Sequence, residues 1–342
     1  MELTARKQKI LSAVVESYIS DGEPIGSKSL IAQTGLNVSS ATVRNELSEL
    51  TEMGFLIQPH TSAGRIPTGQ GYRYYIDNVL RLTPLNENGR DYIQSVLSCG
   101  ADSPENVLQS AANLLSELTE GVALATTPDG EDGRIRKISF VQTGARSAMA
   151  ALIASNGIIK TKLFRCEFLI TPEILEVFDK ALNETFAGIR LSSVNQPFIQ
   201  TAAAGFGELS FLMPSALLAI KEAARLASEV GVYHSDYKRL LRAGESGYAS
   251  AMRLLEFLSD GHDLGRTLGS LPLKTAATIG RENNRTELAE FSVISSRYLI
   301  DSNPSGVLAV IGPQRMDYGR MMSVTEAVAE TVGDIIGGLI EV

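Results

Sequence analysis

Four side chains that can hydrogen-bond lie close together near the start of the chain: Ser40, Thr42, Arg44 and Asn45. Arginine and asparagine form paired hydrogen bonds with guanine and with adenine in the major groove of DNA. Small neighbours such as Ala41 would let the backbone approach the base edges. The group therefore predicts base recognition by these four side chains. The alternative, which the pattern alone leaves open, is a helix whose polar side is simply solvated.

A short hairpin follows and carries a second group of polar side chains. Residues 55–57 are strand-like, residues 62–64 form a Ser-Ala-Gly turn, and the chain then returns through Arg65. The sequence thus predicts a hairpin with one arginine at its tip. We expect His60, Ser62 and Arg65 to contact the DNA backbone or a minor groove, because polar and basic side chains beside a reading helix commonly bind phosphates.

Three helices must hold these residues in place. Apolar residues recur at helical spacing over residues 4–21, and a second, short helix covers residues 28–34. A third helix begins at Ser39 or Ser40, since serine is typical of helix starts. The side of this helix that must pack inward consists of Val43, Leu47 and Leu50. Three helices followed by a hairpin correspond to the winged helix-turn-helix plan.

The charge distribution limits how strongly such a unit can bind DNA nonspecifically. The whole chain of 342 residues carries a net charge of −8. Residues 1–80, called the head below, contain seven Lys or Arg and eight Asp or Glu, and the remaining residues carry −7. Because phosphate neutralisation by basic residues dominates nonspecific affinity, we expect that affinity to be modest. Recognition must then depend on shape and on a few well-placed side chains.

The chain shows no set of residues with the spacing of a catalytic or metal site. The histidines, His60, His234 and His262, lack the spacing to cysteines or carboxylates that metal and catalytic motifs require. Phosphate-loop, nucleophile-elbow and dinucleotide-binding patterns are also absent from the sequence. The sequence therefore predicts a protein that is not an enzyme and that uses no cofactor and no metal.

The composition predicts a cytoplasmic protein. Cys99 and Cys166 are far apart and outside any metal-binding pattern, as expected of reduced thiols. No apolar run reaches the roughly 18 residues that a membrane span needs. The first residues lack the pattern of a signal peptide. We expect no membrane partner, and association with the nucleoid when the protein is bound to DNA.

Beyond the head the pattern changes to a sheet with helices. Residues 81–102 resemble a linker, with a short helix around residues 92–97, and Ser103-Pro104 begins a longer helix. Strand patterns cover residues 138–141, 148–154, 158–164, 275–279, 291–300 and 306–311, before a closing helix. The stretch between the two strand groups is mostly helical, with one further strand near residues 232–241. We therefore expect one antiparallel sheet that is covered by helices and split by an insertion.

Long stretches of the sequence resemble the heat-inducible transcription repressors, the HrcA family. In the head the resemblance rests on GEPIGSKSL, VSSATVRNELSELTEMGFL and QPHTSAGRIPTGQGYRYYID. Near the other end it rests on TIGREN, at residues 278–283, and on GVLAVIGPQRMDYGRMM, at residues 306–322. These stretches bracket almost the whole chain.

The resemblance implies an α+β protein with an amino-terminal winged helix-turn-helix and a GAF-like antiparallel sheet domain. It implies that a mainly helical inserted dimerisation domain interrupts the GAF-like domain. The corresponding ranges are 1–80 for the DNA-binding domain, 81–102 for the linker, 103–168 and 272–342 for the two GAF-like parts, and 169–271 for the insertion.

The resemblance also implies a negative regulator of transcription that binds double-stranded DNA as a homodimer. Its operator would be an inverted repeat upstream of chaperonin and other heat-shock operons, which suits two heads related by symmetry. The chaperonin would help the repressor to reach its active fold. One alternative is a regulator that binds a small molecule in the GAF-like domain, and another is an enzyme with a DNA-binding head.

Two charged stretches beside strands, residues 280–283 and 315–318, permit two interpretations. They are either the rim of a pocket or partner contact, or loop charges that hold the ends of strands in place.

Overall fold

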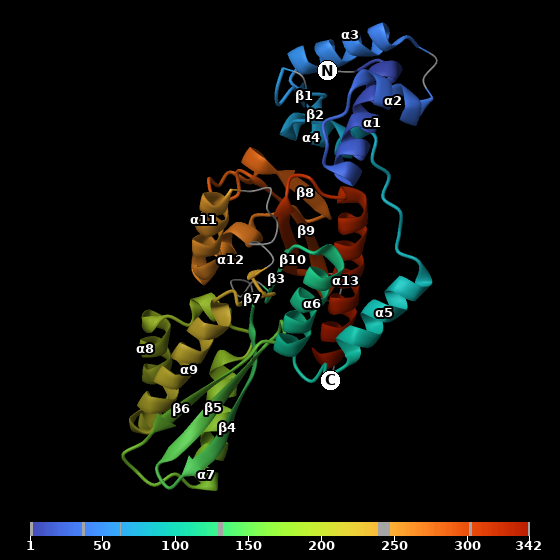
Figure 1. Cartoon of the computed structure of the whole chain (residues 1–342). Coiled ribbons are helices and arrows are strands. Elements are labelled where there is room, and N and C mark those ends of the chain that lie inside the picture. The colour runs from blue at the N-terminus through green and yellow to red at the C-terminus, as the bar shows by residue number, and fades with distance from the viewer. Residues whose placement is uncertain are drawn as a thin grey trace.

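The computed structural model describes residues 3–35, 38–61, 63–128, 133–238, 247–300 and 303–340. They form the head, a central unit built on a five-stranded sheet, and a smaller unit built on a three-stranded sheet (Figure 1). All strand pairs described in the sheets are antiparallel. This mixture of helices and antiparallel sheets confirms the general α+β class that the sequence predicts.

The head consists of helices around a very short two-stranded ladder. Its elements are α1 (Ala5–Asp21), α2 (Ser27–Thr34), α3 (Ser40–Glu52), β1 (Leu56–Ile57), β2 (Ile66–Pro67) and α4 (Gly69–Asn78). The hydroxyls of Thr4, Ser39 and Thr68 each accept a backbone N–H at the start of a helix. The three predicted helices are confirmed, and Ser39 rather than Ser40 is the cap of the third.

Glycines at the ends of α1 and α2 allow the head to close on one core. Gly22 and Gly35 have φ angles of 73° and 60°, a left-handed conformation that side chains rarely adopt. The chain therefore reverses sharply after each helix. The apolar sides of the first three helices meet in a core that includes Ile10, Val14, Leu30, Val43 and Leu50.

The central sheet has the strand order β7-β3-β10-β9-β8. Its strands are β3 (Val122–Thr126), β7 (Val232–His234), β8 (Ala276–Ile279), β9 (Phe291–Ile300) and β10 (Asn303–Pro313). Val310 in the middle strand lies opposite Ala123 on one side and Ile294 on the other. The strand predicted near residues 232–241 covers residues 232–234, and residues 239–241 lie outside the described part of the chain.

Helices cover both faces of this sheet, which explains why residues 122–125 of β3 and 307–311 of β10 are continuous apolar runs. On one face lie α6 (Pro104–Thr119) and α13 (Tyr318–Ile340), against side chains such as Ala123, Leu308 and Val310. On the other face lie α11 (Tyr248–Ser259) and α12 (Gly261–Gly269), against alternate residues such as Val122, Leu124 and Ala309. Figure 1 shows these two layers on either side of the strands.

The segment predicted as a linker contains a substantial helix. α5 (Glu87–Ser98) is longer than the short helix expected around residues 92–97. Ile93 and Leu97 lie one turn apart and are buried in the same core as α6 and α13. Only the stretch between α4 and α5 is extended (Figure 1). Helix α5 is therefore part of the central unit, and only the extended stretch before it connects that unit to the head.

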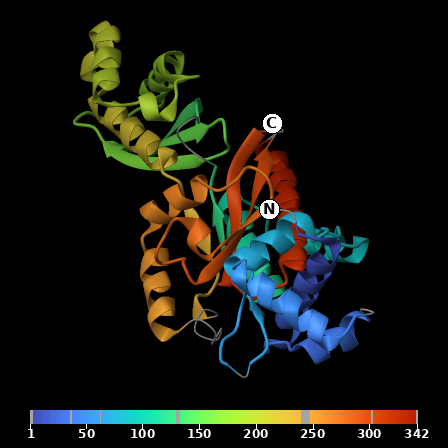
Figure 2. The same cartoon turned by 90° about the horizontal axis from the view of Figure 1, so that it is seen from above.

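The smaller unit is a three-stranded sheet with helices on one face. Its elements are β4 (Ile135–Gly144), β5 (Ser147–Ala154), β6 (Ile159–Arg165), α7 (Pro172–Phe186), α8 (Gln196–Gly205) and α9 (Pro214–Ser228). The turn at Asn156-Gly157 joins β5 and β6, and Gly157 has a φ of 80°, which suits a tight turn. Figures 1 and 2 both show the unit projecting away from the head.

The prediction of one sheet containing both strand groups is wrong. Strands β4, β5 and β6 pair only with each other, and none of them joins β8, β9 and β10. In β5 alternate residues are buried, among them Ala150 and Leu152, against the helical layer of α7 and α9. A strand with one buried face is satisfied by its own helices and needs no second sheet. The strand patterns alone did not specify which strands pair.

Candidate nucleic-acid interface

Helix α3 presents the predicted polar side to solvent. Val43, Leu47 and Leu50 are buried on its inner side, while Arg44 and Asn45 are exposed on its outer side. Within the described part of the chain, neither the Arg44 guanidinium nor the Asn45 amide has a hydrogen-bond or ion-pair partner. Both side chains can therefore bind an external group without breaking a bond in the protein. The predicted orientation of this helix is confirmed.

The two hydroxyl candidates on the same helix take part in local bonds. The Ser40 hydroxyl lies 3.0 Å from the hydroxyl of Ser27 at the start of α2. The Thr42 hydroxyl lies 2.9 Å from that of Ser39, the helix cap. Both residues are half-buried. The structure therefore brings all four predicted residues to one end of α3, with Arg44 and Asn45 more accessible than Ser40 and Thr42.

Arg65 does not lie at the tip of the hairpin, contrary to the prediction. Its backbone forms two hydrogen bonds with Ile25, of 2.9 and 3.1 Å, before β2 begins. Its side chain is bonded as well, since Nε donates to the Thr51 hydroxyl at 3.1 Å. A Cβ on Gly64 would lie 2.3 Å from the Ile25 carbonyl, so only glycine permits this close approach. Arg65 therefore lies at the base of the hairpin.

The outer part of the hairpin contains His60, which is exposed. Ser62, the third predicted hairpin residue, lies outside the described residues. In Figure 2 the hairpin projects from the head as a light-blue loop.

A concavity of about 400 Å³ separates α3 from the base of the hairpin and contains both candidate arginines. Its lining residues are Ile25, Gly26, Ser27, Arg44, Leu47, Gln58, Thr61, Ala63, Gly64 and Arg65. The first turn of α2 also faces it, and no side chain caps this helix at Gly26. Arginine side chains and uncapped helix starts both favour anions. The concavity can therefore accommodate a phosphate group.

A buried carboxylate fixes α3 against α1, and sequence reasoning missed it. Glu46 lies 2.5 Å from an Arg6 nitrogen and 3.0 Å from the Lys7 ammonium, which also binds Glu49 at 2.8 Å. Burial raises the pKa of Glu46, but the bonds with Lys7 and Arg6 outweigh burial and lower it overall. Glu46 stands between Val43 and Leu47 on the inner side of α3, and this position was the available signal.

The head is attached to the central unit through α4. The Arg73 guanidinium binds the Glu282 carboxylate and the Ala277 carbonyl, each at 2.5 Å. The rings of Tyr72 and Tyr318 lie 5.6 Å apart. Figures 1 and 2 show the head over the end of the sheet where β8 ends and α13 begins. The position of the head relative to the sheet is therefore set by specific contacts.

These contacts support the second interpretation of the charged stretches, as charges that hold strand ends in place, although Glu282 and Asn283 also line a small cavity of about 120 Å³. Glu282 accepts the Ile279 N–H at 2.8 Å, so it holds the end of β8 while it binds Arg73 of the head. Arg315 donates to the Ile19 carbonyl at the end of α1, at 3.0 Å. Both stretches thus hold loops and strand ends in place, and both also join the head to the central unit.

Comparison with known proteins identifies the family. The sequence model described as "HrcA protein C terminal domain" matches residues 105–322. A heat-inducible transcription repressor HrcA from Chromobacterium violaceum is 33% identical over 347 residues, which covers 98% of each chain. The corresponding protein from Desulfitobacterium hafniense is 30% identical over 339 residues, again covering 98% of each chain.

The chain belongs to the HrcA family. Membership assigns it to the negative regulators of heat-shock transcription, a class of repressors and not of enzymes. A crystal structure described only as that of a hypothetical protein shares the architecture, with a TM-score of 0.67 and 25% identity. That match covers 99% of this chain and 100% of the other.

The described residues lack two further kinds of feature, a membrane-spanning helix and a metal-binding cluster. None of the helices in the described ranges is both long and apolar enough to cross a membrane. Over the same ranges, no group of three or more His, Cys, Asp or Glu side chains could hold a metal ion.

Proposed function

We propose that this HrcA-family chain binds double-stranded DNA through the head, which acts as a winged helix-turn-helix. The observation that carries the proposal is the outer side of α3, where Arg44 and Asn45 are exposed and unengaged among the described residues. An α-helix fits the major groove, where these two side chain types discriminate guanine and adenine. Ser40 and Thr42 lie at the same end of the helix and complete the proposed reading surface.

The hairpin and the concavity supply contacts to the DNA backbone in this proposal. Arg65 would bind a phosphate from the base of the hairpin, together with the first turn of α2. His60 and Ser62 would reach the backbone or minor groove from the outer part of the hairpin. Phosphate contacts add affinity, whereas base contacts distinguish sequences. We therefore expect Arg65 to contribute affinity, and Arg44 and Asn45 to contribute sequence preference.

We further propose that the chain acts as a homodimer and that the smaller unit joins the two copies. The face of its sheet opposite the helices exposes Val141, Ile159 and Leu163, with exposures of 51%, 52% and 69%. Met149 lies directly between Val141 and Leu163 across the strands, so these side chains are contiguous. An exposed apolar sheet face of this kind is typical of a protein interface.

The sheet topology suggests boundaries for this dimerisation unit that differ from residues 169–271. Strands β3 and β7 pair with each other, and the chain between them, residues 127–231, contains the whole three-stranded sheet and its helices. Helices α11 and α12 instead pack on the central sheet. We therefore propose an inserted unit that begins after β3 and ends before β7.

The proposed operator is an inverted repeat upstream of heat-shock operons, and the proposed modulator is the chaperonin. A C2 dimer presents two equivalent heads, which matches a two-fold symmetric site. The central sheet pairs β3 with β10 across the whole insertion, so its folding requires contacts between residues distant in the chain. Such topologies fold slowly and expose apolar surface on the way, which suits assistance by a chaperonin.

Titration of operator DNA with purified full-length protein tests the head. Asn45→Ala should weaken binding by about 1–3 kcal/mol and relax the preference at one base position. Asn78→Ala removes the same amide from an exposed position on α4 and serves as the matched control. Equal affinities for the two variants would show that α3 is not the reading helix.

A salt titration tests the proposed phosphate contact. Arg65→Ala should weaken binding similarly for all sequences and should make the dependence of affinity on salt shallower by about one phosphate contact. Arg81→Ala, a change of the same charge at an exposed position after α4, should leave the slope unchanged. An unchanged slope for Arg65→Ala would remove this residue from the interface.

A further inference from the structure

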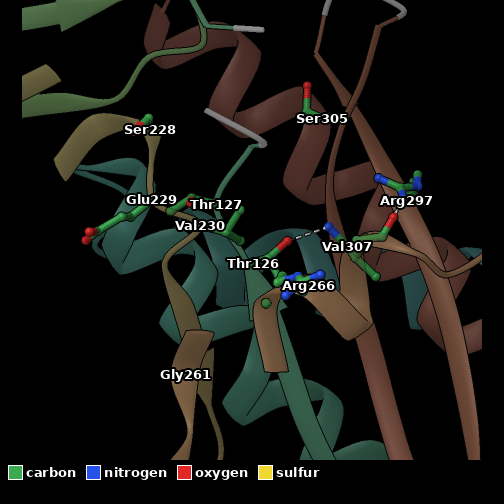
Figure 3. A pocket seen from close by; sticks show the side chains of 12 residues that line it. Thr126, Thr127, Ser228, Glu229, Val230, Gly261, Arg266, Arg297, Ser305 and Val307 are labelled. Carbon is green, nitrogen blue, oxygen red and sulfur yellow. Dashed lines mark hydrogen bonds between the residues drawn. The ribbon is translucent and has the colours of Figure 1, made fainter. Parts of the chain in front are cut away.

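A large open pocket lies where the smaller unit leaves the central sheet. Its volume is about 890 Å³, within the range of roughly 300–1,000 Å³ that is usual for ligand sites. The lining residues are Thr126, Thr127, Ser228, Glu229, Val230, Gly261, Gly265, Arg266, Gly269, Arg297, Ser305 and Val307 (Figure 3). It is separate from the head and from the proposed DNA interface.

The walls of the pocket come from parts of the chain that are distant in sequence. The end of β3 forms one wall and the exit from α9, residues 228–230, forms another. Helix α12 and the strands β9 and β10 complete it. We call residues 228–230 the stem of the smaller unit. A molecule in the pocket would therefore contact both the central unit and this stem.

The charges in the pocket favour an anion. Two arginines line it, Arg266 and Arg297, whereas Glu229 is the one acidic residue in the described lining. Glu229 already pairs with Arg225 on the preceding turn of α9. Arg266 is exposed and has no ion-pair partner among the residues that the structure describes. The charge available to a ligand is therefore positive.

Arg297 is held in place but keeps one donor unused. Its Nη2 donates to the Gly269 carbonyl at 2.6 Å and to the Leu271 carbonyl at 3.3 Å. Its Nε is buried and has no acceptor within the described ranges of the chain. A nitrogen that is closed to solvent cannot be reached from the pocket, so Nε is not a ligand contact. The two carbonyls fix the guanidinium, and its positive charge is thereby held at the wall of the pocket.

Helix α12 turns a bare side toward the pocket. Gly261, Gly265 and Gly269 recur every four residues, so they lie on one side of the helix, and all three line the pocket. A Cβ at Gly261 or Gly269 would meet no atom within 4 Å. Glycine weakens a helix, so three at this spacing are not explained by helix stability. Their absence of side chains keeps the space beside Arg266 open.

Backbone and hydroxyl groups form the opposite wall. The Thr126 hydroxyl accepts the Val307 N–H at 2.9 Å, drawn as a dashed line in Figure 3. The Thr127 hydroxyl accepts the Gly231 N–H at 2.8 Å. These bonds fix both threonines at the end of β3. The wall therefore presents polar groups in set positions, as sites for polar ligands do.

We propose that this pocket binds a small organic or inorganic oxyanion, with its carboxylate or phosphate oxygens on Arg297 and Arg266. The rest of the molecule would lie along the bare side of α12 toward Thr126 and Thr127. Binding of an anion in this pocket does not depend on DNA binding by the head. Because the ligand would bridge the central unit and the stem of the smaller unit, its binding stabilises their junction.

The test is isothermal titration calorimetry of the full-length protein with two probes, citrate for carboxylates and pyrophosphate for phosphates, at constant ionic strength. We expect saturable binding of at least one probe. Arg266→Gln should raise its dissociation constant about tenfold or more, since a charge-assisted hydrogen bond is lost. Gly269→Leu should also weaken binding by filling the pocket, and its Cβ would meet no protein atom within 4 Å.

Arg253→Gln on α11 removes the same charge from an exposed position outside the pocket and should leave the dissociation constant unchanged. Thermal unfolding of each variant without probe verifies that it is folded. Which probe binds distinguishes a carboxylate from a phosphate ligand. The proposal is overturned if neither probe binds saturably, or if Arg266→Gln and Gly269→Leu both bind as tightly as the unaltered protein.

Discussion

Replacing Glu46 by glutamine tests how α3, the proposed reading helix, is held in the head. The side chain of Glu46 is only 5% exposed, and its carboxylate binds Arg6 and Lys7 of α1. Glutamine keeps the size but removes the charge that these two cations face. Breaking a fully buried ion pair costs about 3–5 kcal/mol. The Arg6 side chain is 52% exposed, so solvent screens its share, and we expect a loss of about 1–3 kcal/mol in head stability.

Amide hydrogen exchange in α1 and α3 measures this loss, because it reports the opening of the head separately from the other units. Glu49→Gln is the matched control: Glu49 shares Lys7 but its side chain is 55% exposed. Its loss should be clearly smaller. Equal effects of the two substitutions, or no effect of Glu46→Gln, would refute the reasoning that burial makes this carboxylate important.

The same residue makes a prediction about pH. The pKa of Glu46 is lowered in the folded protein, so its ionised form is the one that stabilises the head. Its contribution is fully present above the ordinary glutamate pKa of about 4.3 and is lost as the pH falls through the lowered folded value. The unaltered head should therefore lose stability as the pH falls below about 5, where glutamates begin to titrate. In Glu46→Gln this acid-induced loss of head stability should be smaller. An identical acid dependence in the two proteins would contradict this assignment.

Two further substitutions test the junction between the head and the central unit and the proposed dimer interface. Arg73→Met should increase hydrogen exchange in α4, because it removes the bonds to Glu282 and to the Ala277 carbonyl. Unchanged exchange would show that these contacts do not hold the head against the central unit. Leu163→Asp should convert the proposed dimer to monomers in sedimentation experiments by placing a charge on the open apolar sheet face. Val177→Asp, the same kind of change at an exposed position on α7, should leave the dimer intact, and a dimer that survives Leu163→Asp would exclude this face.

Local features of the fold could be predicted from the sequence because they depend on neighbouring residues. Gly22 and Gly35 follow the two helices predicted over residues 4–21 and 28–34, and the Asn156-Gly157 turn joins two of the predicted strands. Strand β9 covers the predicted residues 291–300. In each case a turn residue or an apolar period, acting over a few positions, determines the structure.

The pairing of strands and the contacts between units could not be predicted in this way. Nothing in the strand patterns showed that β5 belongs to a separate sheet, since alternation specifies a buried face and not a partner. Arg73 and Glu282 are 209 residues apart in the chain, so no local pattern relates them. The base position of Arg65 likewise depends on Ile25, which approaches only because residue 64 is glycine.

The central claim is that two heads, each using α3, bind a symmetric operator. Footprinting of the purified full-length protein on the DNA upstream of its own coding sequence tests it most directly, with and without added chaperonin. We predict two protected half-sites related by two-fold symmetry, centred one helical turn of about 10 base pairs, or a multiple of it, apart. Asn45→Ala should weaken both half-sites together. Protection of a single asymmetric site would contradict the account. The absence of any protection would also contradict it, provided that the unaltered protein and Asn78→Ala are dimeric and folded under the same conditions.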